Sequence, residues 1–134
     1  MRKVNFISIV DDDPITVFGI RKMLNATVEC NIVESHINGK LALESIKERI
    51  AMSKPLPEII FLDINMPIMD GWQFLEEFIK LPITKNVKVN IVTSSIDPYD
   101  IEQWNFFKSK TKHTITFNNK PIKKLEMVEI TRVA

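Results

Sequence analysis

The sequence predicts an α/β protein in which helices cover both faces of one parallel sheet. Short strand-like apolar runs alternate five times with segments whose apolar residues recur every three or four positions. The central run, 58–62, is apolar on both faces, as expected for a parallel strand covered on each side. Because short right-handed crossovers leave few other arrangements, we expect a doubly wound sheet of five strands with five helices.

The first two strand and helix units are read from the periodicity of their apolar residues. A β-branched and apolar run at 4–10 predicts a strand, which ends at three acids and a proline. The segment 14–24 has that proline in its first turn and apolar residues at helical spacing. A second strand is predicted at 29–35, and after an Asn-Gly pair the segment 41–50 again has helical spacing.

The last three units follow the same alternation. Two prolines interrupt the chain before the strand at 58–62. The helix predicted at 70–81 has a broad apolar stripe, and Asp70 is a suitable residue to cap its start. The remaining strands are predicted at 87–92 and 114–117, and the remaining helices at 98–107 and 122–130.

Composition indicates one globular domain and gives no electrostatic reason to propose nucleic acid or an anionic membrane as a partner. The 134 residues are 45% hydrophobic, and 18 Lys and Arg against 17 Asp and Glu leave a net charge of +1. We expect residues 1–134 to form one domain without an output domain. The apolar N-terminal run is too short for a signal peptide or a membrane span, and the lone Cys30 is expected to be a buried thiol. A cytoplasmic protein is the interpretation that fits both features.

Polar residues gather at the positions where the predicted strands end. In open α/β sheets, ligands bind beyond the carboxyl ends of the strands, near a point where the strand order reverses. All the residues with obvious chemistry are therefore expected on one edge of the sheet: Asp11, Asp12 and Asp13 after the first strand, Asp63 after the third, Thr93 to Ser95 after the fourth, and Lys120 after the fifth.

Carboxylates that converge on one edge repel each other, and a divalent cation relieves the repulsion. Oxygen ligands of this kind suit Mg²⁺, and we expect Asp12, Asp63 and the backbone carbonyl of Asn65 to hold it. A carboxylate beside such an ion can attack a phosphoryl group if positive charge gathers around the phosphoryl oxygens. Lys120 can supply that charge, and the hydroxyl of Thr93 is an additional donor.

Four motifs lie along the chain in a fixed order: Ile9-Val-Asp-Asp-Asp-Pro14, Leu62-Asp-Ile-Asn-Met-Pro-Ile-Met-Asp-Gly71, Ile91-Val-Thr-Ser94 and Asn119-Lys-Pro121. In this order and spacing they resemble the receiver domain of two-component response regulators, including the single-domain chemotaxis regulators. The resemblance covers nearly the whole chain and implies a flavodoxin-like fold with strand order 2-1-3-4-5.

The resemblance implies that Asp63 is the phosphoacceptor and takes its phosphoryl group from a phosphohistidine. The donor would be a sensor histidine kinase or a His-phosphotransfer protein. Asp12 would ligate Mg²⁺ (or Mn²⁺) directly and Asp11 through a water molecule, while Thr93 and Lys120 would contact the phosphoryl oxygens.

The resemblance also implies a switch and a cis peptide bond. The Lys120 to Pro121 bond would be cis, which would aim the lysine inward. On phosphorylation Thr93 would move toward the phosphoryl group, and the ring of Phe117, three positions before the lysine, would turn inward. The face built from the last two helices and the strand between them would then bind an unidentified downstream protein.

Two positions are expected to tune the lifetime of the phosphoryl group. Asn65 lies two residues after the acceptor and Ser95 two residues after Thr93. The resemblance implies that residues at these positions control access of the attacking water. The chain is therefore expected to be a phosphoacceptor with self-catalysed phosphotransfer and autodephosphorylation, rather than an enzyme acting on other substrates.

Two other functions remain as alternatives. A phosphatase of the haloacid dehalogenase type also forms an aspartyl phosphate, but it requires a second Asp where this chain has Asn65. The other alternative is an interaction module of receiver fold that is not phosphorylated. Asp13 is explained as well by helix capping as by metal binding, and His36 and His113 lack partners at metal-ligand spacing.

Overall fold

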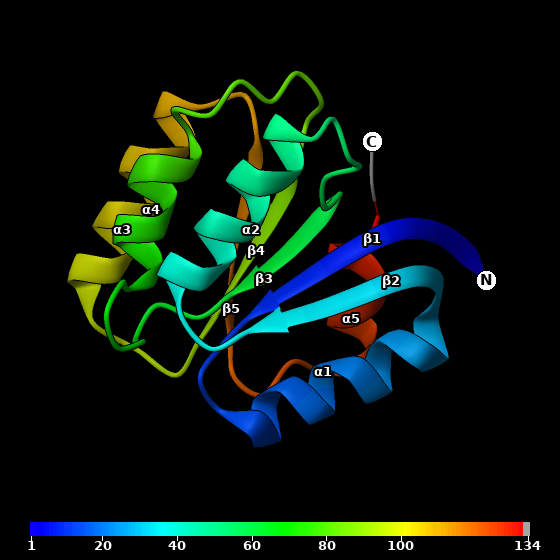
Figure 1. Cartoon of the computed structure of the whole chain (residues 1–134). Helices are drawn as coiled ribbons and strands as arrows, with labels where there is room; N and C mark the ends of the chain where they lie inside the picture. Colours follow the sequence, from blue (N-terminus) through cyan, green and yellow to red (C-terminus); the bar gives the residue numbers. More distant parts are fainter. Residues whose placement is uncertain (133–134) are drawn as a thin grey trace.

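The computed structural model describes residues 1–132 and consists of five strands that alternate with five helices (Figure 1). Each strand is followed by a helix throughout the chain, as the apolar periodicity predicts. The elements are β1 (Arg2–Val10), α1 (Pro14–Thr27), β2 (Val28–His36), α2 (Gly39–Ala51), β3 (Ile59–Leu62), α3 (Gly71–Phe78), β4 (Lys88–Thr93), α4 (Pro98–Lys110), β5 (Thr114–Asn119) and α5 (Lys124–Ile130).

The five strands form one parallel sheet with the order β2-β1-β3-β4-β5. The chain starts in β1, crosses to the edge strand β2 and then returns past β1 to β3. The strand order therefore reverses between β1 and β3, where Val10 pairs with Leu62 at the carboxyl ends of both strands. The predicted fold class and the strand order implied by the resemblance are both confirmed.

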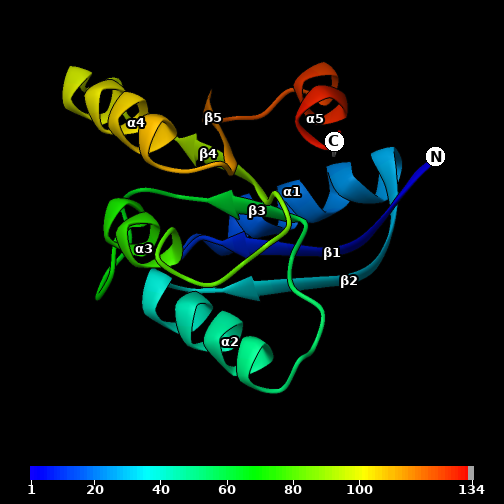
Figure 2. The ribbon, with the colours of Figure 1, turned by 90° about the horizontal axis from the view of Figure 1, so that it is seen from above.

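Two layers of helices enclose the sheet. Helices α1 and α5 lie on one face, and α2, α3 and α4 lie on the other (Figure 2). All four side chains of β3 are buried, because this central strand is covered from both sides. Within the described residues no helix has the length and apolar character needed to cross a membrane.

Each face of the sheet has its own apolar core. Phe74, Leu75 and Phe78 of α3 pack on the α2, α3 and α4 side. On the other face, Leu24 of α1 and Met127 of α5 belong to one core with Val4, Ile7 and Ile9 of β1. Burial of each large side chain contributes roughly 1.5–3 kcal/mol, so the two cores fix the strand ends to which the polar residues are attached.

The helix predicted at 70–81 ends earlier, at Phe78, and continues as tight turns. The N–H of Leu81 bonds to the carbonyl of Phe78 at 3.0 Å, an i to i−3 bond. Pro82 disfavours the helical conformation at the residue before it, which explains the early end. Leu81 still packs on the core, and for this reason the apolar stripe extends beyond the helix.

Two further expectations need correction. The helix predicted from 122 begins at Lys124, because Ile122 is a buried residue of the preceding loop. Cys30 is only partly buried, since β2 is an edge strand and its residues are less covered than those of β3. Its thiol donates to the carbonyl of Ile32, and partial burial raises the pKa of the thiol.

Candidate phosphoacceptor and metal site

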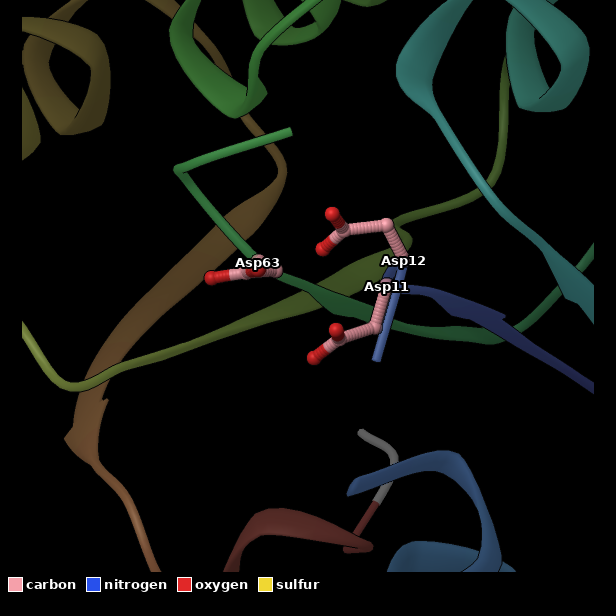
Figure 3. Close-up of side chains that lie close together, drawn as sticks. All are labelled: Asp11, Asp12 and Asp63. Carbon is pink, nitrogen blue, oxygen red and sulfur yellow. The ribbon is translucent and has the colours of Figure 1, made fainter. Parts of the chain in front are cut away.

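Three carboxylates converge at the carboxyl edge of the sheet, where the strand order reverses (Figure 3). Asp11 and Asp12 follow β1 and Asp63 follows β3, and one carboxylate oxygen from each lies within 4.8 Å of the others. Asp11 and Asp63 are buried, whereas Asp12 is exposed. The cluster is therefore accessible to solvent at Asp12.

Backbone hydrogen bonds that continue the strands hold the two buried acids. The N–H of Asp63 donates to the carbonyl of Val10 at 2.9 Å, and the N–H of Asp11 donates to the carbonyl of His36 at 3.0 Å. One carboxylate oxygen of Asp63 accepts from the N–H of Ile64 at 2.9 Å. The second carboxylate oxygen of Asp63 therefore remains available to interact with neighbouring charged groups.

The loop after Asp63 returns closely to the acceptor, and this approach requires a glycine. The N–H of Gly71 bonds to the carbonyl of Ile64 at 2.9 Å. A Cβ at Gly71 would lie 2.5 Å from the carbonyl oxygen of Asp63 and 2.9 Å from the Cα of Ile64, far inside van der Waals contact. Asp70 caps α3 and forms a capping box with Gln73, as predicted for its position.

Lys120 brings positive charge to the acids from the end of β5. Its Nζ lies 3.0 Å from an oxygen of Asp11 and 3.7 Å from an oxygen of Asp63. The peptide bond between Lys120 and Pro121 is cis, in agreement with the resemblance. The sequence motif and the geometry therefore point to the same cation for this edge of the sheet.

The electrostatics of Asp63 are those of a crowded buried carboxyl. Its pKa is raised to about 6, first by burial and then by the charge of Asp11, while Lys120 opposes both effects. A second positive charge at the open side would lower this pKa by stabilising the ionised form. Three clustered carboxylates are hard oxygen donors of the kind that bind Mg²⁺, so the donor set fits such an ion.

The other predicted site residues lie around this cluster. Thr93 ends β4 and is fully buried; its hydroxyl oxygen accepts from the N–H of Ser95 at 3.0 Å. Asn65 is an exposed residue of the loop after Asp63. Phe117 lies on β5 and is partly buried, with its ring 5.6 Å from that of Trp104 of α4. The ring of Phe117 is thus in contact with α4.

Asp13 and His113 have structural roles, and His36 takes no part in the acidic cluster. Asp13 caps α1, accepting from the N–H of Ile15 at 3.0 Å and from the hydroxyl of Thr16 at 2.9 Å, and these bonds lower its pKa. His113 is buried and accepts the N–H of Val87 at 3.0 Å. His36 lies outside the one carboxylate cluster that can hold a metal in residues 1–132.

Asp100 is a buried residue near the site that the sequence patterns did not identify. Its carboxylate accepts from the indole N–H of Trp72 at 2.9 Å and from the hydroxyl of Ser95. From the sequence, Asp100 is an ordinary acid in the first turn of a helix. A buried tryptophan needs a partner for its N–H, but nothing in the sequence indicates which residue provides it.

Comparison with known proteins shows the family. The family model for the response regulator receiver domain matches residues 7–132, so the chain belongs to the response regulator receiver domain family. A hybrid signal transduction histidine kinase L of Dictyostelium discoideum is 33% identical over 94% of this chain, which corresponds to 7% of that protein. A protein-glutamate methylesterase/protein-glutamine glutaminase of Treponema denticola is 36% identical over 66% of this chain.

The chain spans only part of these relatives, 21% of the length of the Treponema denticola protein. Among solved structures, a two component response regulator from Cytophaga hutchinsonii is 25% identical with a TM-score of 0.77, covering 96% of this chain and 95% of that one. A CheX-CheY-BeF3-Mg complex from Borrelia burgdorferi is 25% identical with a TM-score of 0.73, covering 93% and 84%. These structures share the fold of most of this chain.

Proposed function

We propose that this chain is a phosphoryl-accepting receiver of two-component signalling and that Asp63 is its acceptor. The observation that carries the proposal is the position of Asp63: a buried carboxylate at the reversal of strand order, flanked by Asp11, Asp12 and Lys120. Membership of the receiver family supports this assignment.

The reaction is a transfer from nitrogen to oxygen. The free carboxylate oxygen of Asp63 attacks the phosphorus of a phosphohistidine, so that a P–O bond forms and the P–N bond breaks. The imidazole nitrogen that leaves keeps the bonding electron pair and takes a proton from solvent. The donor is a sensor histidine kinase or a His-phosphotransfer protein, and later attack of water on phosphorus returns phosphate and the free carboxylate.

The residues around Asp63 divide the remaining tasks. Asp12, Asp63 and the carbonyl of Asn65 would hold Mg²⁺ or Mn²⁺, and Asp11 would bind it through a water molecule. When bound, this ion would neutralise the charge that develops on the phosphoryl oxygens. Lys120 binds a phosphoryl oxygen from the other side.

The readout passes through the ends of β4 and β5. The hydroxyl of Thr93 donates to a phosphoryl oxygen, and the ring of Phe117 turns inward into the space that Thr93 vacates. Because Phe117 packs on Trp104, this movement changes the face formed by α4, β5 and α5, which binds the downstream protein. Asn65 and Ser95 set the phosphoryl lifetime by controlling access of water.

A labelling experiment tests this function. The protein is incubated with Mg²⁺ and acetyl phosphate, and intact mass spectrometry is used to look for one base-labile phosphoryl group. We expect labelling of the wild type, none of Asp63→Asn, and normal labelling of the control Asp13→Asn, which changes a capping acid close by. An unlabelled wild type would refute the proposal and favour an interaction module, whereas continuous hydrolysis of phosphoesters would indicate a phosphatase.

A further inference from the structure

One buried hydrogen-bond network outside the phosphoacceptor cluster links the loop between β4 and α4 to two helices. Its members are Trp72 at the start of α3, Ser95 in the loop and Asp100 in α4; we call these three residues the latch. Trp72 and Asp100 are both less than a tenth exposed, so their hydrogen bond is shielded from water.

Ser95 is the centre of the latch because each of its polar groups has a partner. Its hydroxyl donates to Asp100 and accepts the N–H of Asp97 at 3.2 Å. Its backbone carbonyl accepts from the side chain of Asn119 at 3.2 Å, and its backbone N–H donates to the hydroxyl of Thr93 at 3.0 Å. A shift of Ser95 therefore has to break bonds to α4 and to β5.

The hydrogen bond between Ser95 and Thr93 connects the latch to the proposed phosphorylation switch. Thr93 must reorient to meet a phosphoryl group on Asp63, and in this structure its hydroxyl is held by the N–H of Ser95. Asp100 keeps Ser95 in place, and the indole of Trp72 keeps Asp100 in place. The network thus stabilises the arrangement in which Thr93 is engaged with its own loop.

We propose that Asp100 is a positioning residue that, through Ser95, opposes the movement of Thr93 and so sets the resting balance of the switch. The inference rests on the proposed function, because the movement of Thr93 that Asp100 opposes has a role only if Asp63 accepts a phosphoryl group. Removal of Asp100 shifts the resting population toward the arrangement in which Thr93 faces Asp63.

The size of the effect follows from population arithmetic. A ligand that binds one state of a two-state protein has its affinity reduced by the fraction of molecules in that state. If that fraction is about one tenth at rest, full release of the latch raises the affinity at most about tenfold. The probe is beryllium fluoride with Mg²⁺, which mimics a phosphoryl group on a carboxylate.

The experiment uses a background that avoids an unpaired buried group. Trp72→Phe removes the indole N–H, so later loss of Asp100 leaves no orphaned donor there, and it makes Trp104 the only tryptophan. Trp104 packs against Phe117 with tilted rings and donates to the carbonyl of Ile115 at 2.9 Å, so its fluorescence reports the packing of α4 on β5.

In this background, Asp100→Ala is expected to raise the affinity for beryllium fluoride about fivefold to tenfold. It should also move the Trp104 fluorescence of the free protein toward that of the bound protein. Asp100→Asn, which can still bond to the Ser95 hydroxyl, should remain within about twofold of the background. The control Glu102→Ala, which removes an exposed acid of the same helix, should change neither quantity.

Three outcomes decide the matter. An Asp100→Ala variant with lower stability toward urea but unchanged affinity and fluorescence overturns the proposal, because Asp100 is then purely structural. A reduced affinity overturns it as well, since the network would then favour the bound arrangement. If the wild type neither binds beryllium fluoride nor labels with acetyl phosphate, the proposed function fails first and the latch proposal fails with it.

Discussion

The close approach of Gly71 to Asp63 leads to a quantitative prediction for Gly71→Ala. The added Cβ would meet the carbonyl oxygen of Asp63 at 2.5 Å and the Cα of Ile64 at 2.9 Å, both backbone atoms. Ordinary van der Waals contacts begin at 3.4 Å. The start of α3 and the acceptor loop must therefore separate by roughly the gap between 2.5 Å and 3.4 Å. Overpacking of this kind costs about 1–3 kcal/mol of unfolding free energy.

The displacement also affects the proposed chemistry. A misplacement of about 1 Å in a reacting group can cost on the order of 100-fold in rate. We expect Gly71→Ala to lower the urea midpoint by about 1 M, given a dependence of about 1–3 kcal/mol per M, and to slow labelling of Asp63 by acetyl phosphate at least tenfold. Both measurements are made on the same preparation, so that the folded fraction is known.

Gly19 provides the matched control, because it is a helical glycine with open space around it. A Cβ there meets nothing within 4 Å, so Gly19→Ala should increase stability by about 0.5–1 kcal/mol and leave the labelling rate unchanged. Equal midpoints and equal labelling rates for Gly71→Ala and the wild type would refute the argument from close approach. A destabilised Gly19→Ala would show that the Cβ geometry does not predict the response of this chain.

Three further predictions concern the charges and the cap around the site. Because the pKa of Asp63 is raised from 3.8 to about 6, the folded protein binds more protons than the unfolded chain between these values, and its stability falls as pH rises through that window. Without Mg²⁺, Asp63→Asn should therefore be more stable than the wild type by up to about 3 kcal/mol at pH 7.5 and nearly equal at pH 4 in urea titrations; a difference that grows toward acid would contradict this. Lys120→Met leaves Asp11 and Asp63 without their cation, so we expect a raised pKa of Asp63 by NMR titration and at least tenfold slower labelling, and an unchanged pKa would exclude the assigned contacts. Asp70→Ala removes the cap of α3 and should cost about 1 kcal/mol in unfolding free energy, whereas Asp70→Asn, which still caps, should cost less than half of that.

The parts of the site that follow the strand ends were predictable from the sequence. Strands were recognisable as apolar runs, and parallel topology brings all their carboxyl ends to one edge. That Asp11, Asp63 and Lys120 share one edge of the sheet follows from this rule alone, without knowledge of side-chain packing. The same reasoning does not give their distances or their burial. It does not indicate, for example, that Nζ of Lys120 lies 3.0 Å from an oxygen of Asp11 instead of pointing to solvent.

Element boundaries were less predictable because local chemistry and tertiary packing compete there. The apolar stripe of α3 suggested a helix to Leu81, although Pro82 ends the regular helix earlier and Leu81 stays packed by way of tight turns. Cys30 was expected to be buried because its neighbours are apolar. Its partial exposure depends on the place of β2 at the sheet edge, which apolar periodicity alone does not indicate.

The latch depends on side-chain packing, whereas the strand-end residues are brought together by the topology of the sheet. Trp72 and Asp100 are 28 residues apart and come from different helices, so no spacing rule relates them. Their hydrogen bond exists because both helices pack on the same face of the sheet, where the ring of Trp72 stacks on Phe107 at 5.8 Å. Acceptor chemistry can thus be read from residues at strand ends, which the fold brings together in any chain of this topology. As proposed, the resting balance of the switch depends on buried side-chain contacts that the strand-end residues do not specify, so two chains with the same site residues can differ in how readily they respond.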